Sequence, residues 1–174
     1  MPVQDKPVQK QKIYLETTLF NLYFDVDREH HYDAVRLFEE IAAGKYEAFT
    51  SLGAINEINE ARAEKRNKMI ALVDRYDIRI LALNDEAERL AQAYVEQGII
   101  PSKYRTDGVH IAVATVNDLD ILISMDLGHI VRQKTKIGAR NINTLNGYRS
   151  VEICTPMEVL AMESPSIHED QQNR

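Results

Sequence analysis

Cysteine is almost absent from this 174-residue sequence, and long apolar runs are missing altogether. The single cysteine, Cys154, excludes an internal disulfide and a zinc site built from several cysteines. No stretch approaches the roughly 20 apolar residues of a membrane span, and residues 1–12 are polar where a secretory signal is apolar. We therefore expect a cytoplasmic protein from a reducing compartment, neither inserted in a membrane nor exported.

Several sequence motifs that mark common enzyme classes are also missing. There is no internal repeat, no glycine-rich phosphate loop, no zinc-binding His-Glu-x-x-His run and no serine-elbow motif. The apolar share of 44% and the charged share of 28% are ordinary for a globular protein, and the length suits one hydrophobic core. We predict one domain over residues 12–160, with flexible tails at 1–11 and 163–174.

The net charge of −6 weighs against nucleic-acid binding, because Lys and Arg supply most of the affinity for phosphates. The charge is distributed unevenly, however. No acidic residue occurs between Leu127 and Val151, a segment that contains several cations: His129, Arg132, Lys134, Lys136, Arg140 and Arg149. This segment permits RNA binding, although a solvated surface explains it equally well.

Short apolar runs alternate with longer segments of helical spacing. The runs predict strands at Ile13–Leu15, Ala48–Thr50, Ile78–Leu83, Ile121–Ser124 and Val151–Cys154. The spacing predicts helices at Tyr32–Ala43, Leu52–Tyr76, Glu86–Gln97, Asp107–Val116 and Ile137–Leu145. This order predicts an α/β fold, a three-layer α/β/α sandwich around a central, mainly parallel five-stranded sheet.

Four acidic residues fall where functional groups gather in parallel sheets, beyond the carboxyl ends of the strands. Glu16 directly follows the first predicted strand, and Asp126 closely follows the fourth. Asp107 opens a predicted helix after Thr106, a candidate N-cap, and Glu57 lies about two turns into the helix that follows Ser51. We expect these four carboxylates to meet at one edge of the sheet.

Carboxylates that meet in one site repel one another, unless their pKa values rise or a hard cation neutralises them. We therefore predict a site for Mg²⁺ or Mn²⁺ formed by Glu16, Glu57, Asp107 and Asp126. Such a cation activates water for attack on a phosphodiester. Taken singly, Asp107 is better explained as a first-turn acid and Glu57 as a solvated helix residue, so the prediction rests on the set.

Nearby hydroxyl and imidazole groups have supporting or structural interpretations. Thr17, Thr18 and Ser124 are candidates to orient the carboxylates or a metal-bound water, or simply to cap turns. His110 and His129 invite roles as bases or ligands. We interpret His110 as a hydrogen-bonded structural residue of a packed helix and exclude it from the metal set.

These residues resemble the PIN-domain family, in particular the VapC-like toxin ribonucleases of prokaryotic toxin–antitoxin systems. The likeness runs from about Ile13 to Leu160. Its most specific block is Asp107-Gly108-Val109-His110-Ile111-Ala112-Val113-Ala114, which is similar to the family's Asp-x-x-His-Ile-Ala-x-Ala helix. Further blocks are Ile13-Tyr14-Leu15-Glu16-Thr17-Thr18, Ser51 six residues before Glu57, and Ile121-Leu122-Ile123-Ser124-Met125-Asp126.

The resemblance implies a Mg²⁺- or Mn²⁺-dependent endoribonuclease that acts on RNA, forms a homodimer and is held in check by a cognate antitoxin protein. One position departs from the family, since Glu16 stands where the family usually has Asp. Two other hypotheses stay open. One is a catalytically silent PIN-fold module that binds RNA or protein through the basic segment, and the other is a phosphatase or flap-type DNA nuclease using the same acids.

Overall fold

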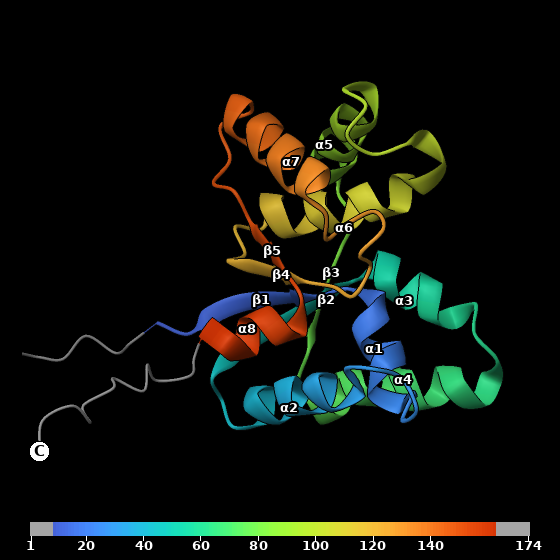
Figure 1. Cartoon of the computed structure of the whole chain (residues 1–174). Coiled ribbons are helices and arrows are strands. Elements are labelled where there is room, and N and C mark those ends of the chain that lie inside the picture. The colour runs from blue at the N-terminus through green and yellow to red at the C-terminus, as the bar shows by residue number, and fades with distance from the viewer. Residues whose placement is uncertain (1–8, 163–174) are drawn as a thin grey trace, which may run out of the picture.

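The computed structural model describes residues 9–162 of the chain, in which strands and helices alternate from end to end (Figure 1). The strands are β1 (Gln11–Leu15), β2 (Tyr46–Ser51), β3 (Arg79–Leu81), β4 (Ile121–Ile123) and β5 (Glu152–Cys154). The helices are α1 (Thr17–Phe24), α2 (His31–Ala42), α3 (Leu52–Asn59), α4 (Ala63–Arg75), α5 (Asp85–Glu96), α6 (Arg105–Val116), α7 (Gln133–Leu145) and α8 (Pro156–Met162), with a short 3-10 helix, η1 (Ser102–Tyr104), before α6.

All strand pairs in the sheet are parallel, and the strand order is β3-β2-β1-β4-β5. The first strand is therefore central, with Ile13 opposite Ala48 of β2 on one side and Ile121 of β4 on the other. The sandwich with a parallel five-stranded sheet, which the alternating pattern predicted, is confirmed. Because β1 is central, the residue that follows it lies in the middle of the sheet's carboxyl edge.

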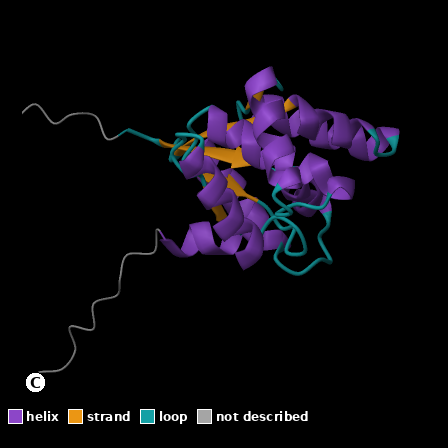
Figure 2. Cartoon of the chain, turned by 90° about the horizontal axis from the view of Figure 1, so that it is seen from above, coloured by secondary structure: helices purple, strands orange, loops and turns teal. Residues whose placement is uncertain are grey.

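Helices cover both faces of the sheet, with α1, α2, α4 and α8 on one side and α5, α6 and α7 on the other (Figure 1). Seen from above, these helices hide much of the sheet (Figure 2). Side chains alternate between the two cores, as they must in a pleated strand. Ile13 and Leu15 enter the core under α1 and α2, whereas Tyr14 enters the core under α6. The inner strands β1, β2 and β4 are thus largely buried on both faces, which explains their apolar runs, whereas the edge strand β3 is exposed or half-buried.

Local signals fix several boundaries near the site. The Ser51 hydroxyl accepts a hydrogen bond from the Ala54 amide at 3.2 Å and begins α3. The Asn84 side chain accepts from the Ala87 amide at 2.9 Å and begins α5. Gly44 takes a positive φ of 83° directly after Ala43, the C-cap of α2. These three boundaries agree with the sequence prediction.

The prediction of one helix over Leu52–Tyr76 is wrong, because the chain turns between α3 and α4 at residues 60–62. No glycine or proline marks this turn, so the local sequence carried no signal of it. The assignment of Thr106 as an N-cap is also wrong, since α6 begins at Arg105 and takes Thr106 into its first turn. The short helices α1 and α8 were not predicted.

The predicted tails at 1–11 and 163–174 lie largely outside the described residues, which do not include 1–8 or 163–174. Within the described part, Gln11 belongs to β1 and α8 continues to Met162, so ordered elements extend slightly beyond the predicted domain of 12–160. No helix of the described part is both long enough and apolar enough to cross a membrane.

Candidate metal site

The four predicted acids come from four different elements at the carboxyl edge of the sheet. Glu16 follows β1, Glu57 lies in the second turn of α3, Asp107 in the first turn of α6, and Asp126 in the loop after β4. Within residues 9–162, two groups of three side chains offer potential metal-ligand atoms, and within each group these atoms lie no more than 4.8 Å apart. The groups are Glu16, Glu57 and His110, and Asp107, Asp126 and His129.

Glu16 is buried and held through one carboxylate oxygen. Oε2 accepts hydrogen bonds from the Thr18 hydroxyl at 2.5 Å, the Thr18 amide at 3.2 Å and the Ser124 hydroxyl at 2.8 Å. The residue is 3% exposed and caps the first turn of α1. The same carboxylate thus starts a helix and joins β1 to the loop after β4, which fixes its position.

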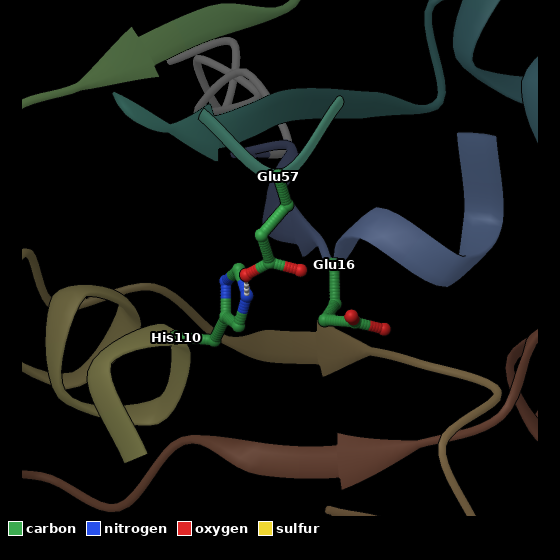
Figure 3. Close-up of side chains that lie close together, drawn as sticks. All are labelled: Glu16, Glu57 and His110. Carbon is green, nitrogen blue, oxygen red and sulfur yellow. Dashed lines mark hydrogen bonds and ion pairs between the residues drawn. The ribbon is translucent and has the colours of Figure 1, made fainter. Parts of the chain in front are cut away.

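Glu57 and His110 form the second contact of the site (Figure 3). The Glu57 carboxylate lies beside the His110 ring, with Oε1 2.6 Å from Nε2. Nδ1 of His110 lies 2.5 Å from the Tyr14 hydroxyl, which in turn lies 2.7 Å from the Ser51 hydroxyl. A buried chain of polar groups therefore runs from the helix cap of α3, under the sheet's edge, to the Glu57 carboxylate.

The charges along this chain favour an ionised pair. Burial opposes ionisation of Glu57, but the hydrogen bond and the charge of His110 outweigh it and lower the pKa of the Glu57 carboxyl. Burial alone lowers the pKa of His110, yet the hydrogen bond to Glu57 and the charges of Glu16 and Asp107 raise it above its ordinary value. Burial keeps the pKa of Tyr14 well above its usual range, so its hydroxyl stays neutral.

Asp107 and Asp126 face each other across His129. Nδ1 of His129 lies 3.5 Å from Oδ2 of each aspartate. The other oxygen of Asp126 accepts the amides of Gly128 and His129 at 3.1 and 3.0 Å, which folds the loop back on the carboxylate. The ring of Tyr104 stacks on the His129 ring with centroids 3.8 Å apart.

Asp107 is the acid most affected by its neighbours. Burial, followed by the negative charges of Asp126 and Glu16, raises the pKa of the Asp107 carboxyl to about 6. The nearby histidines, His110 and His129, act in the opposite direction and do not cancel the effect. A cation bound among these carboxylates would remove the repulsion, so the donor set and its charge fit a hard divalent ion.

The hydroxyl candidates differ in what they contact. The Ser124 hydroxyl donates a hydrogen bond to Glu16 and accepts one from the Asp126 backbone amide at 2.9 Å, so it links two of the four acidic residues. Thr18 donates to Glu16 and accepts the Met125 amide at 2.8 Å. Thr17 Oγ1 is buried without a hydrogen bond of standard geometry in the described chain, yet lies close enough to Glu57 to help lower its pKa.

The buried position of His110 agrees with its interpretation as a hydrogen-bonded residue of a packed helix. The sequence did not predict the contacts of Tyr14 and Tyr104. Tyr14 does lie in the core, but its hydroxyl ends at His110, and Tyr104 is stacked on His129. Neither contact leaves a local sequence signal, since Tyr14 and His110 are 96 residues apart.

The basic segment does not form one continuous face. Arg149 pairs with Asp118 and Asp120, at 2.8 and 2.9 Å, where the chain enters β4 at the far edge of the sheet. Lys136 lies 3.9 Å from Glu158 of α8. Arg132 is the N-cap of α7, and its side chain donates to the Thr135 hydroxyl. His129, at the beginning of the segment, is the member that contacts acids of the candidate site.

Comparison of the fold with solved structures gives matches over most of the chain. VapC20 of Mycobacterium tuberculosis, described as a sarcin–ricin loop cleaving toxin, matches with a TM-score of 0.54 and 14% identity, over 80% of this chain and 98% of that one. A chain of VapBC2 from Rickettsia felis, solved with a DNA fragment from its promoter, matches with a TM-score of 0.53 and 10% identity, over 83% and 98%.

The chain has a VapC-like PIN fold. The structural resemblance predicted from the Asp107–Ala114 block is thereby confirmed at the level of the fold. No family model matches the sequence, and no curated protein matches it. At 10–14% identity the likeness concerns the PIN fold alone, so the function rests on the residues at its acidic edge.

Proposed function

We propose that this protein is a divalent-metal-dependent endoribonuclease and the toxin component of a toxin–antitoxin pair. The observation that carries the proposal is that Glu16 and Glu57, and Asp107 and Asp126, belong to two groups of potential metal ligands at the carboxyl edge of a VapC-like fold. Mg²⁺ and Mn²⁺ prefer such carboxylate oxygens. When bound, the ion supplies an activated water for in-line attack on a phosphodiester and stabilises charge on the departing oxygen.

The chain's own residues prepare the acids for this task. Thr18 and Ser124 donate hydrogen bonds to Oε2 of Glu16, which leaves Oε1 without a hydrogen bond within residues 9–162. The protonated form of His110 donates to Glu57 and holds it ionised. Asp107 gives up its proton when a cation replaces the repulsion from Asp126. In this scheme four carboxylates are positioned and charged before the RNA arrives.

The partners follow from the same proposal. VapC20 is described as a toxin that cleaves the sarcin–ricin loop, and VapBC2 was solved with promoter DNA. We propose that this chain likewise acts on RNA and is controlled by a cognate antitoxin protein, as a homodimer in the cytoplasm. These points are predictions, as is the assignment of all four acids as catalytic metal ligands.

The decisive experiment measures cleavage of a mixed, structured RNA by the purified protein with Mg²⁺, Mn²⁺ or EDTA. Asp107→Asn and Asp126→Asn are measured beside it. The matched control is Asp118→Asn, which changes an exposed acid at the other edge of the sheet. Asn tolerates the positive φ of 55° at position 118, so this variant is expected to fold normally.

The proposal expects metal-dependent cutting by the wild type and by Asp118→Asn, and none by the two site variants. Equal cutting by all four proteins would indicate a contaminating nuclease. RNA binding that EDTA leaves unchanged, with no cutting under any metal, would support the silent binding module instead. Parallel assays with single-stranded DNA, flap DNA and a phosphomonoester distinguish a ribonuclease from the other phosphoesterases.

A further inference from the structure

His129 is placed to do more than neutralise the two aspartates beside it. Its Nδ1 lies 3.5 Å from Oδ2 of Asp107 and 3.5 Å from Oδ2 of Asp126. The ligand atoms of these three residues lie within 4.8 Å of one another. A point equidistant from three atoms so spaced lies about 2.0–2.4 Å from each, which is the bonding range of small divalent metals.

The imidazole is held in this position by two independent contacts. Its backbone amide donates to Oδ1 of Asp126 at 3.0 Å, which holds the backbone of His129 beside the Asp126 carboxylate. Tyr104 stacks on the ring at an interplanar angle of 26° and restricts its rotation. The side chain of His129 is 31% exposed, so solvent reaches this residue.

We propose that Nδ1 of His129 is the third protein ligand of the cation held by Asp107 and Asp126, and that this nitrogen makes the site prefer Mn²⁺ over Mg²⁺. The inference rests on the metal-dependent nuclease proposed above and specifies its ion. Imidazole nitrogen suits borderline transition metals, whereas Mg²⁺ takes oxygen ligands and keeps much of its water. A site with two carboxylates and one imidazole therefore binds Mn²⁺ more tightly than a site with carboxylates alone.

A structural role for His129 predicts a different outcome. As a cation between two carboxylates, the ring compensates charge in the metal-free protein and leaves when a metal enters. As a ligand, it remains within bonding distance of the metal. Pulsed electron paramagnetic resonance of bound Mn²⁺ separates the two roles, because a directly bound imidazole nitrogen couples to the electron spin of the ion.

The experiment uses the full-length wild-type protein with stoichiometric Mn²⁺, prepared once with natural histidine and once with ¹⁵N-histidine. His129→Phe removes the nitrogen but keeps an aromatic ring for Tyr104 to stack on. The matched control is His30→Asn, which changes a histidine that pairs with Asp33 before α2 and has the positive φ that Asn tolerates. Circular dichroism verifies that each variant is folded.

The proposal expects a ¹⁴N coupling in the wild type and in His30→Asn that changes to ¹⁵N on labelling and is lost in His129→Phe. It also expects the Mn²⁺ dissociation constant of His129→Phe to rise about tenfold or more, with little change for Mg²⁺. No nitrogen coupling in the wild type would overturn the proposal without any variant. A coupling that persists in His129→Phe would assign the ligand to another histidine, such as His110, and overturn it equally.

These results are separable from the nuclease assay. A nitrogen-ligated Mn²⁺ site in a protein that cuts no RNA would leave the His129 ligand standing and reject the proposed activity. Metal-dependent cutting by the wild type together with unchanged Mn²⁺ affinity in His129→Phe would support the proposed activity and reject His129 as a ligand.

Discussion

Glu57 Oε1 and His110 Nε2 lie 2.6 Å apart, and the opposite nitrogen of the same ring lies 2.5 Å from the Tyr14 hydroxyl. Glu57 is therefore positioned from inside the protein, by a residue of the central strand, although its own helix lies at the surface. Tyr14 and His110 are 0% and 1% exposed, so the contacts of this chain exclude water. Buried polar networks of this kind depend on every member being satisfied.

Tyr14→Phe is expected to weaken both stability and metal binding. The substitution keeps the ring packing but leaves His110 Nδ1 and the Ser51 hydroxyl without their partner, which costs about 1–3 kcal/mol of unfolding free energy. Glu57 then loses its fixed orientation, and the Mn²⁺ affinity falls. Urea unfolding and Mn²⁺ titration measure the two effects. Tyr32→Phe, at a site 76% exposed, should change neither. Wild-type stability in Tyr14→Phe would show that the buried hydrogen-bond network is not needed for stability.

Asp107→Asn is expected to stabilise the metal-free protein at neutral pH. The pKa of Asp107 is raised from 3.8 to about 6 in the folded state, so the folded protein binds more protons than the unfolded chain between these values. Stability therefore falls as pH rises through this window, and the penalty is complete above pH 6. Asn carries no charge at any pH and avoids the penalty, which is about 3 kcal/mol by the conversion of pKa shifts to energy.

The test is urea unfolding of both proteins in EDTA at several pH values from 4 to 8. The stability difference should be near zero at pH 4 and largest above pH 6. With saturating Mn²⁺ the order should reverse, because the ion stabilises only a folded protein that binds it. A stability difference that is the same at every pH would show that ionisation of Asp107 does not cause the loss of stability.

Glu16→Asp is expected to weaken the site, although Asp is usual at this position in the family that the sequence resembles. The side chain shortens by roughly 1.5 Å, one carbon–carbon bond, which withdraws Oε2 from Thr18 and Ser124. Loss of these supporting hydrogen bonds should raise the Mn²⁺ dissociation constant about tenfold or more. Glu64→Asp, at an 85% exposed side chain, is the control for calorimetric titration. Equal or tighter binding would mean that the loop readjusts to the shorter acid.

Gly138→Ala is expected to destabilise the fold away from the site. A Cβ at this position in α7 would lie 2.6 Å from Cγ1 and 2.8 Å from Cδ1 of Ile99. Overpacking lowers the free energy of unfolding by about 1–3 kcal/mol, while the better helix propensity of Ala raises it by about 1 kcal/mol. Thermal unfolding of Gly138→Ala, Ile99→Val and the double variant checks this, since the smaller Val should relieve part of the clash. Strict additivity in the double variant would rule out the contact.

Local chemistry was enough to predict the sheet and the edge at which the acids meet. The inner strands were identifiable because both of their faces are buried, as Ile121 and Leu122 of β4 show by entering opposite cores. Once the strands are parallel, the residues that follow them must lie at one edge, which brings Glu16 toward Asp126. These inferences need only periodicity and the handedness of crossovers.

The remaining details depend on contacts between distant parts of the chain. Helix α1 was missed because its eight residues are mostly apolar and its cap is Glu16, a residue type seldom used for that purpose. The pairing of Tyr14 with His110 follows from the packing of α6 on β1, and the stacking of Tyr104 on His129 from the approach of η1 to the loop after β4. No local pattern encodes such pairs.

The central place of β1 also determines when the site becomes complete during translation. Glu16 and Glu57 are contributed by the first third of the chain, but β1 receives its second neighbour only when β4 is made. Asp126 lies beyond that strand, and its backbone amide completes the bridge through Ser124 to Glu16. A nascent chain therefore carries an incomplete acidic cluster until more than two thirds of it has been synthesised.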